Sequence, residues 1–204
     1  MAACTKTTTL TGEIAHDTSS GFPSMLLHSC CAPCASAAIE RLIDSYSLTL
    51  FFFNPNIQPG SEHGKREAEF KKLASLAFDG KAVRIVIAEY DNEAFERIIL
   101  QFADTSMPEG GNRCTACFQM RLDRTAEHAK KNGYSYFATT LTVSPHKNAE
   151  VINALGEVAS VKHGVKYYAS DFKKKNGFKR SVELSNELGL YRQNYCGCLC
   201  SIRD

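Results

Sequence analysis

The sequence has no long hydrophobic run, almost no net charge and no recognisable targeting segment. Its longest apolar run, residues 48–53, is interrupted by Thr49 and is far too short to span a bilayer. Lysine and arginine number 24 against 22 acidic residues, so the net charge of +2 gives no global attraction to nucleic acid. The first residues show neither the apolar core of a signal peptide nor the arginines of a transit peptide. We therefore expect a cytoplasmic protein without membrane contact.

The domain organisation that we expect is simple. Residues 1–22 are dominated by Ser and Thr and are predicted to form a loose N-terminal extension. Residues 23–204 are long enough to bury a core of their own, and we expect them to form a single catalytic α/β domain.

Strand-like and helix-like segments alternate along this domain. The expected strands are residues 24–29, 48–53, 82–88, 134–140 and 165–169. The expected helices are residues 34–45, 61–77, 93–102, 114–131, 149–163 and 181–188, with Asn92 capping the third and glycines following the fourth, fifth and sixth. Alternation of this kind predicts an open, mostly parallel five-stranded sheet with helices on both faces.

Nine cysteines form the most informative feature of the sequence. Cys4 stands alone in the polar N-terminal segment, where we expect no role for it, and the others fall into three groups: Cys30, Cys31 and Cys34; Cys114 and Cys117; Cys196, Cys198 and Cys200. An odd number without a secretion signal argues against a disulfide framework and favours metal or redox chemistry. The simpler alternative is that these cysteines are small buried hydrophobes.

The first cysteine group lies where a strand is expected to end and a helix to begin. Pro33 suits the first turn of a helix, and a helix N-terminus stabilises thiolates, the form that binds metal or attacks. Ligands of open parallel sheets bind beyond the carboxyl ends of the strands. If the first and fourth strands are neighbours, residues 30–34 and residues 144–147 face one crevice, and we expect the metal site there.

Four-cysteine sites hold either zinc or an iron–sulfur cluster. Cys114 and Cys117 share one face of a helix, and two further thiolates are needed to complete a site, for which Cys30 and Cys31 are the nearest candidates. An adjacent pair of cysteines is awkward for one tetrahedral ion and easier for the separate iron corners of a cluster. The spacing therefore favours a cluster and leaves zinc open.

The remaining candidates each have two interpretations. Cys196-Gly197-Cys198 could form a strained, redox-active disulfide or supply two more metal ligands. Cys34 could bind a second metal or be an accessory thiol, and His28 could be structural or part of the site. His146, beside Lys147, is a candidate for substrate or phosphate contact. Lys173, Lys174 and Lys175 lie near aromatic residues, as in many nucleic-acid contacts, although a run of charges is usually a solvated face.

In combination these motifs resemble the epoxyqueuosine reductases of the QueH type, over residues 25–201. The matching segments are Leu27-His28-Ser29-Cys30-Cys31-Ala32-Pro33-Cys34, Asn54-Pro55-Asn56-Ile57, Arg113-Cys114-Thr115-Ala116-Cys117-Phe118 with Arg121-Leu122, Thr139-Thr140-Leu141 with Ser144-Pro145, Asp171-Phe172-Lys173-Lys174, and Leu190-Tyr191-Arg192-Gln193 with Tyr195-Cys196-Gly197-Cys198. Any single CxxC pair is a weak signal, but the ordered combination is very specific.

The resemblance implies a tRNA-modifying enzyme that reduces epoxyqueuosine to queuosine in the anticodon loop, without cobalamin and with an unidentified electron donor. It implies a 4Fe–4S cluster and a redox-active disulfide, with an additional iron ion in some members. The cluster ligands carried over are Cys30, Cys31, Cys114 and Cys117; the disulfide is Cys196–Cys198; Cys34 is the candidate ligand of the second metal, although some relatives carry Asp there; Arg192 is a candidate RNA contact.

The resemblance also implies the fold of the adenine-nucleotide alpha-hydrolase-like, or Rossmann-like, proteins. Because cysteines stand where an SGGxDS phosphate loop would lie, we do not expect ATP use. Two rival functions are a zinc-stabilised RNA-binding module and a thiol–disulfide oxidoreductase that uses Cys31 and Cys34.

Overall fold

The computed structural model describes residues 21–202 apart from 77, 79, 82 and 103–108. Cys4 and residues 1–20 of the predicted extension lie outside the described residues, so the predicted domain boundary stays a prediction.

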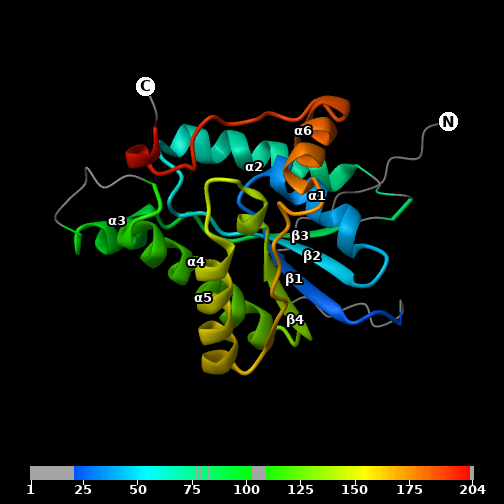
Figure 1. Ribbon diagram of the computed structural model, residues 1–204, viewed down its shortest axis with the longest axis horizontal. Coiled ribbons are helices and arrows are strands. Elements are labelled where there is room, and N and C mark those ends of the chain that lie inside the picture. Colours follow the sequence, from blue (N-terminus) through cyan, green and yellow to red (C-terminus); the bar gives the residue numbers. More distant parts are fainter. Residues whose placement is uncertain (1–20, 77, 79, 82, 103–108, 203–204) are drawn as a thin grey trace.

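The core of the protein is a five-stranded sheet with the order β3-β2-β1-β4-β5 (Figure 1). The strands are β1 (Ser24–His28), β2 (Ser47–Phe52), β3 (Arg84–Ile87), β4 (Tyr136–Thr139) and β5 (Lys166–Tyr167). Every neighbouring pair is parallel. The predicted open α/β architecture is therefore confirmed, and β1, which pairs with β2 and β4, is its central strand.

Helices cover both faces of the sheet, as Figure 1 shows for α1 and α2 on one side and α4 and α5 on the other. Alternate residues of β1 point to the two layers: Met25 and Leu27 belong to the core cluster under α1 and α2, and Leu26 to the cluster under α4 and α5. The helices are α1 (Ala32–Leu42), α2 (Gly60–Ser75), α3 (Asn92–Ile99), α4 (Asn112–Lys131), α5 (Ala149–His163) and α6 (Gly177–Glu187), with short 3-10 turns η2 (Thr140–Val143) and η3 (Leu199–Ser201). Burial on both faces explains why the strands are apolar throughout.

The strand order reverses between β1 and β4, and His28 ties the strand ends together at that point. Its Nε2–H donates to the Phe53 carbonyl at 3.1 Å, and Nδ1 accepts from the Thr139 hydroxyl at 2.9 Å. Burial, with a smaller contribution from Arg121, lowers the pKa of His28 to about 4. His28 is therefore a neutral structural residue that braces the edge of the sheet where the cysteines lie.

Two predicted helix boundaries were wrong. Asp91, and not Asn92, caps α3: its carboxylate accepts from the Ala94 N–H at 2.9 Å, whereas the Asn92 amide donates to the Pro55 carbonyl at 2.7 Å. Helix α6 begins at Gly177, four residues before the predicted start at Ser181, because Asn176 in the left-handed region (φ 61°) turns the chain into the helix. The end of the basic stretch is thus helical.

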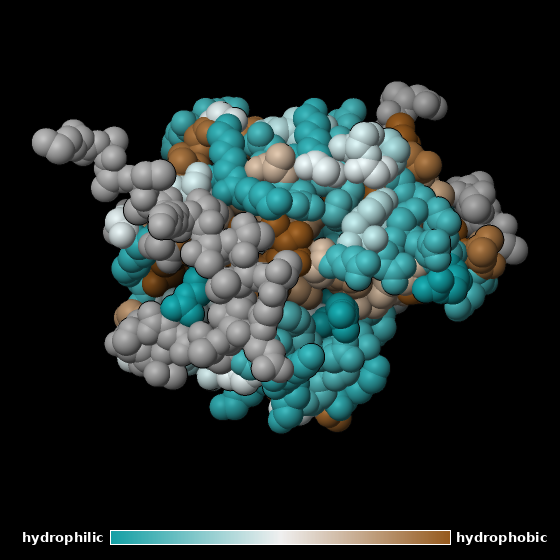
Figure 2. Space-filling model, turned by 180° about the vertical axis from the view of Figure 1, so that it is seen from behind, coloured by the Kyte–Doolittle hydropathy of each residue, from teal (hydrophilic) through white to brown (hydrophobic). Residues whose placement is uncertain are grey.

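On the face of the molecule shown in Figure 2, hydrophilic residues cover most of the coloured surface and apolar residues appear as separate patches. Within the described residues, none of the helices combines the length and the apolar character that crossing a bilayer requires. The large apolar side chains gather mainly in the two clusters against the sheet.

The contact between α5 and β5 yields a stability prediction. Gly156 lies against the buried Tyr167 ring, whose centroid is 5.0 Å from that of the tilted Phe137 ring and whose hydroxyl donates a hydrogen bond to Asn153. A Cβ at Gly156 would overlap that ring, so Gly156→Ala should destabilise the protein by about 1–3 kcal/mol despite the better helix propensity of Ala.

Gly64→Ala in α2 is the matched control, because a Cβ there meets nothing within 4 Å. It should stabilise the protein by about 1 kcal/mol. Urea unfolding of both variants checks the pair, and equal stabilisation by the two changes would contradict the packing argument.

Candidate metal and redox site

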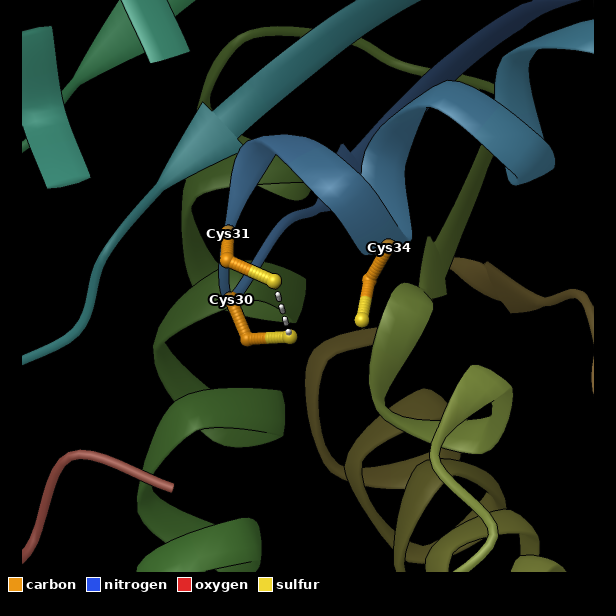
Figure 3. Close-up of side chains that lie close together, drawn as sticks. All are labelled: Cys30, Cys31 and Cys34. Carbon is orange, nitrogen blue, oxygen red and sulfur yellow. Dashed lines mark hydrogen bonds between the residues drawn. The ribbon is translucent and has the colours of Figure 1, made fainter. Parts of the chain in front are cut away.

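The thiols of Cys30, Cys31 and Cys34 form a compact triad where β1 passes into α1. Their sulfur atoms all lie within 4.8 Å of one another, and those of Cys30 and Cys31 are 3.9 Å apart. Figure 3 shows the three side chains turned toward one another at the start of α1. Cys31 is the N-cap residue in extended conformation, so the backbone turns between Cys30 and the helix and both adjacent thiols reach one site. The expected turn at Pro33 is present.

The triad concentrates negative charge on Cys30. Hydrogen bonds from the Cys31 and Cys34 thiols, helped by Lys147 and Thr140, lower the pKa of Cys30 well below its usual value. The same interactions raise the pKa of Cys31 to about 12 and that of Cys34 as well. The Cys30 N–H also donates to Thr140 Oγ1 at 3.3 Å. Among the three thiols, deprotonation is therefore favoured at Cys30, at the junction of β1 and β4.

Cys114 and Cys117 lie on the first turns of α4, at the same edge of the sheet. Cys117 is buried against Phe95 and Cys198, and burial raises its pKa to about 11. A small cavity of about 20 Å³ is lined by both cysteines of α4 and by Cys196 and Cys198. The second and third cysteine groups therefore meet.

Arg121 lies one turn beyond Cys117 on α4. Its side chain is 1% exposed, and its Nε–H donates to the Cys117 carbonyl at 3.2 Å. Nη1 and Nη2 are buried and have no hydrogen-bond partner among the described residues, and the same is true of both amide atoms of Asn56. Arg121 and Asn56 both line the small cavity. Buried donors of this kind fit a bound group that is rich in hydrogen-bond acceptors.

The C-terminal cysteine segment is fastened to the rest of the protein through its backbone. Arg66, 2% exposed, donates from Nη1 to the Cys196 carbonyl at 3.0 Å and from Nη2 to the Tyr195 carbonyl at 3.2 Å, while its Nε binds Glu62. The Gly197 carbonyl accepts from the Gln58 N–H at 2.8 Å. Gly197 has φ +129°, and a Cβ there would come within 2.9 Å of Ile57, so only glycine fits this close approach.

A larger cavity of about 180 Å³ lies beside the triad and opens between the loops that follow β1 and β4. Cys30, Cys34 and Cys196 line it together with Lys147. Cys196 therefore lines both cavities, and the predicted crevice between the first and fourth strands is present.

The comparisons with known proteins all indicate one family. The family model "Epoxyqueuosine reductase QueH" matches residues 25–204. The chain belongs to the epoxyqueuosine reductase QueH family. It is 43% identical over 180 residues to "Epoxyqueuosine reductase QueH" of Staphylococcus epidermidis, covering 87% of this chain and 75% of the relative.

Two further relatives carry the same name. That of Streptococcus pyogenes is 42% identical over 179 residues, covering 87% of this chain and 69% of the relative. That of Thermotoga maritima is 38% identical over 182 residues, covering 89% of this chain and 91% of the relative. The resemblance inferred from the motifs is thereby confirmed.

In this QueH chain the predicted cluster ligands are brought to one edge of the sheet but not into one tight set. Among the described residues, the group of three or more metal-ligating side chains that lies within 4.8 Å is Cys30, Cys31 and Cys34, without Cys114 and Cys117. All eight described cysteines are free thiols, Cys196 and Cys198 included. A single ion needs a set as tight as the triad, whereas the separate corners of a cluster hold their thiolates farther apart.

The predicted substrate contacts of the QueH chain divide into two groups. His146 and Arg192 line the larger cavity; the Arg192 guanidinium lies 5.8 Å from the Phe178 ring and donates to the Ser181 carbonyl at 3.0 Å. Lys173 is tied to Asp171 at 3.0 Å and to the Lys147 carbonyl at 3.3 Å. Lys174 is 77% exposed and Lys175 is exposed as well. The three lysines therefore do not form one equivalent surface.

Sequence reasoning missed Arg66, Glu109 and Arg121 as parts of the site. Glu109 pairs with the buried Lys147 at 3.2 Å in the wall of the larger cavity. The spacing of Arg121 could have revealed it, because positions 114, 117 and 121 share one face of a helix. Arg66 gave no such signal, since with Glu62 it has the spacing of an ordinary surface ion pair.

Proposed function

We propose that this chain reduces epoxyqueuosine to queuosine in the anticodon loop of tRNA, acting in the cytoplasm. The observation that carries the proposal is the convergence of all three cysteine groups on two adjoining cavities, both lined by Cys196, in a chain of the QueH family. Removing an epoxide oxygen to leave a double bond consumes two electrons and two protons and releases water. The site must therefore deliver electrons and protons to one oxygen atom.

For the electrons we propose a 4Fe–4S cluster held by Cys30, Cys31, Cys114 and Cys117. The donor set is chemically suitable, and the buried N–H groups of Arg121 and Asn56 fit an anionic group with many acceptors. When bound, the cluster would supply electrons one at a time. Cys34 is the candidate ligand of an additional iron ion, because its sulfur completes the tight triad.

Cys196 and Cys198 would hold the electron pair as a dithiol that can close to a disulfide. Two features support this role: Cys196 lines both cavities, and Gly197 gives the loop the backbone freedom that a tight Cys-Gly-Cys disulfide needs. An electron donor outside the chain would restore the dithiol after each turnover. We propose that no cobalamin takes part.

Lys147 is the residue that we propose to hold a proton over the departing oxygen. Burial alone would lower its pKa, but the charges of Cys196, Cys30 and Glu109 outweigh burial and raise it, so Nζ stays protonated. Lys147 lies in the wall of the cavity that contains the thiols. A hydrogen bond from Nζ would favour C–O cleavage as negative charge develops on the oxygen.

The tRNA would bind over the mouth of the larger cavity. Lys174 and Lys175 precede Phe178, which lines that cavity together with Arg192, so basic and aromatic side chains gather on one rim. The weak 3.6 Å pair between Lys174 and Asp171 leaves the exposed ammonium available for phosphate.

The first test separates the two classes of cysteine. Replacing Cys30, Cys31, Cys114 or Cys117 by Ala should lose iron, sulfide and turnover, because three thiolates leave a cluster open and labile. Cys196→Ser and Cys198→Ser should keep the cluster and tRNA binding and lose multiple turnover. Iron analysis beside turnover on anaerobically purified protein decides; full iron in two variants of the first class, or iron loss in the second, would refute the assignment.

The second test concerns Lys147. Lys147→Met should lower kcat by about 10²–10⁴-fold while iron content stays, because the proton at Nζ is lost. Glu109→Gln is the control: it removes the charged partner of Lys147 but keeps the cation, so its effect should be smaller. Unchanged kcat in Lys147→Met would exclude the proposed role.

The third test concerns tRNA affinity. The Lys174→Ala, Lys175→Ala double variant should weaken tRNA binding and lower the slope of log affinity against log salt by about 0.7–0.9 for each phosphate that is no longer neutralised. Lys71→Ala, which removes a partly exposed lysine paired with Glu67, is the control and should leave both the affinity and the slope unchanged. If the salt slope of the double variant equals that of the wild type, residues 174 and 175 belong to a solvated face that does not contact tRNA.

A further inference from the structure

Arg121 is a buried cation for which the described residues provide no carboxylate partner. The guanidinium carries five N–H donors, and in this structure Nε–H alone is used, by the Cys117 carbonyl. Nη1 and Nη2 are buried without a hydrogen-bond partner among the described residues, and the side chain is 1% exposed. An isolated buried cation is among the costliest groups that a protein can hold.

The surroundings of Arg121 indicate what its partner would be. The thiols of Cys117, Cys196 and Cys30 act on it electrostatically, and it lines the small cavity together with Cys114 and Cys117. It follows Cys117 by one helical turn on the same face of α4, so both α4 cysteines and the guanidinium border one volume. Two of the four cysteines proposed as cluster ligands therefore border the same volume as Arg121, and a third, Cys30, is close enough to act on its charge.

Lys147, another cation near the thiols, has a carboxylate partner. Its ammonium pairs with Glu109 at 3.2 Å, so a carboxylate partly cancels its field. Within the described part of the chain no carboxylate bonds to the Nη atoms of Arg121, and the groups that raise its pKa most are thiols. Within the described residues, its positive charge therefore acts mainly on the cysteines and on whatever they bind.

We propose that Arg121 is a positioning residue that donates N–H···S hydrogen bonds to the metal centre and raises its reduction potential. The proposal rests on the proposed function, because it requires the cluster at the cysteines. Four thiolates make such a cluster anionic, and reduction adds one more negative charge. A buried cation stabilises the reduced form more than the oxidised form, and salt does not screen it there.

The competing explanation is that Arg121 only packs α4. Its guanidinium lies 5.5 Å from the Phe118 ring and makes a hydrogen bond within its own helix. A packing role affects the free energy of unfolding and leaves the potential of the metal centre unchanged. The two explanations are therefore separated by electrochemistry rather than by activity.

The experiment compares Arg121→Gln, Arg121→Lys and Arg124→Gln with the wild type under anaerobic conditions. Arg124 is a matched control on the same helix, because it is 52% exposed and pairs with Glu127 instead of facing the cysteines. Iron and sulfide are measured first, and wild-type protein without them would refute the proposed cluster itself. The midpoint potential then follows from a redox titration monitored by the paramagnetic signal of the reduced cluster.

Arg121→Gln should keep iron and shift the midpoint to a more negative value. At the wild-type midpoint the ratio of reduced to oxidised cluster should fall by about tenfold or more, which is about 59 mV for one electron. Arg121→Lys should lie between Gln and the wild type, and Arg124→Gln should match the wild type. A wild-type potential in Arg121→Gln would overturn the proposal. If that variant cannot hold iron, Arg121→Lys decides: a wild-type potential with lower stability overturns it, and a more negative potential supports it.

Discussion

The reversal of strand order between β1 and β4 is the constraint on which the rest of this structure depends. On one side of β1 the chain proceeds to β2 and β3, and on the other it returns as β4 and β5. The loops after β1 and β4 must therefore separate, since α1 lies on one face of the sheet and α5 on the other. The resulting opening receives the first cysteine group, and His28 holds its base together.

Charge balance is the second requirement of this opening. The deprotonated form of Cys30 is stabilised by Lys147 and by hydrogen bonds from the neighbouring thiols, and the Lys147 ammonium is in turn stabilised by the charges of Cys196 and Cys30. Neither the negative sulfur charge nor the positive lysine charge would be stable alone in a buried site, because each would lack both water and a partner of opposite charge. The cysteines, Lys147 and Arg121 therefore form one electrostatic unit rather than separate features.

The sequence allowed the fold to be predicted because the fold depends on local patterns. Apolar strands, the Asn132-Gly133 helix end and the Gly164 helix end were all predicted correctly, whereas the start of α6 was wrong because a left-handed Asn176 is not visible as a helix signal. The grouping of the cysteines was likewise visible. The contacts of Arg66 were not, because its partners lie about 130 residues away and the chain offers no local sign of them. Such contacts belong to tertiary packing, which local periodicity does not encode.

The way in which Arg66 fastens the last cysteines has a consequence for their chemistry. Arg66 binds the carbonyl oxygens of Tyr195 and Cys196, and Gln58 binds the carbonyl of Gly197; none of these bonds involves a sulfur atom. The anchor is thus indifferent to the oxidation state of the segment that it holds. None of these hydrogen bonds would have to break if the Cys196 sulfur formed or lost a covalent bond. The main-chain anchoring of the segment is therefore separate from the chemistry of its side chains.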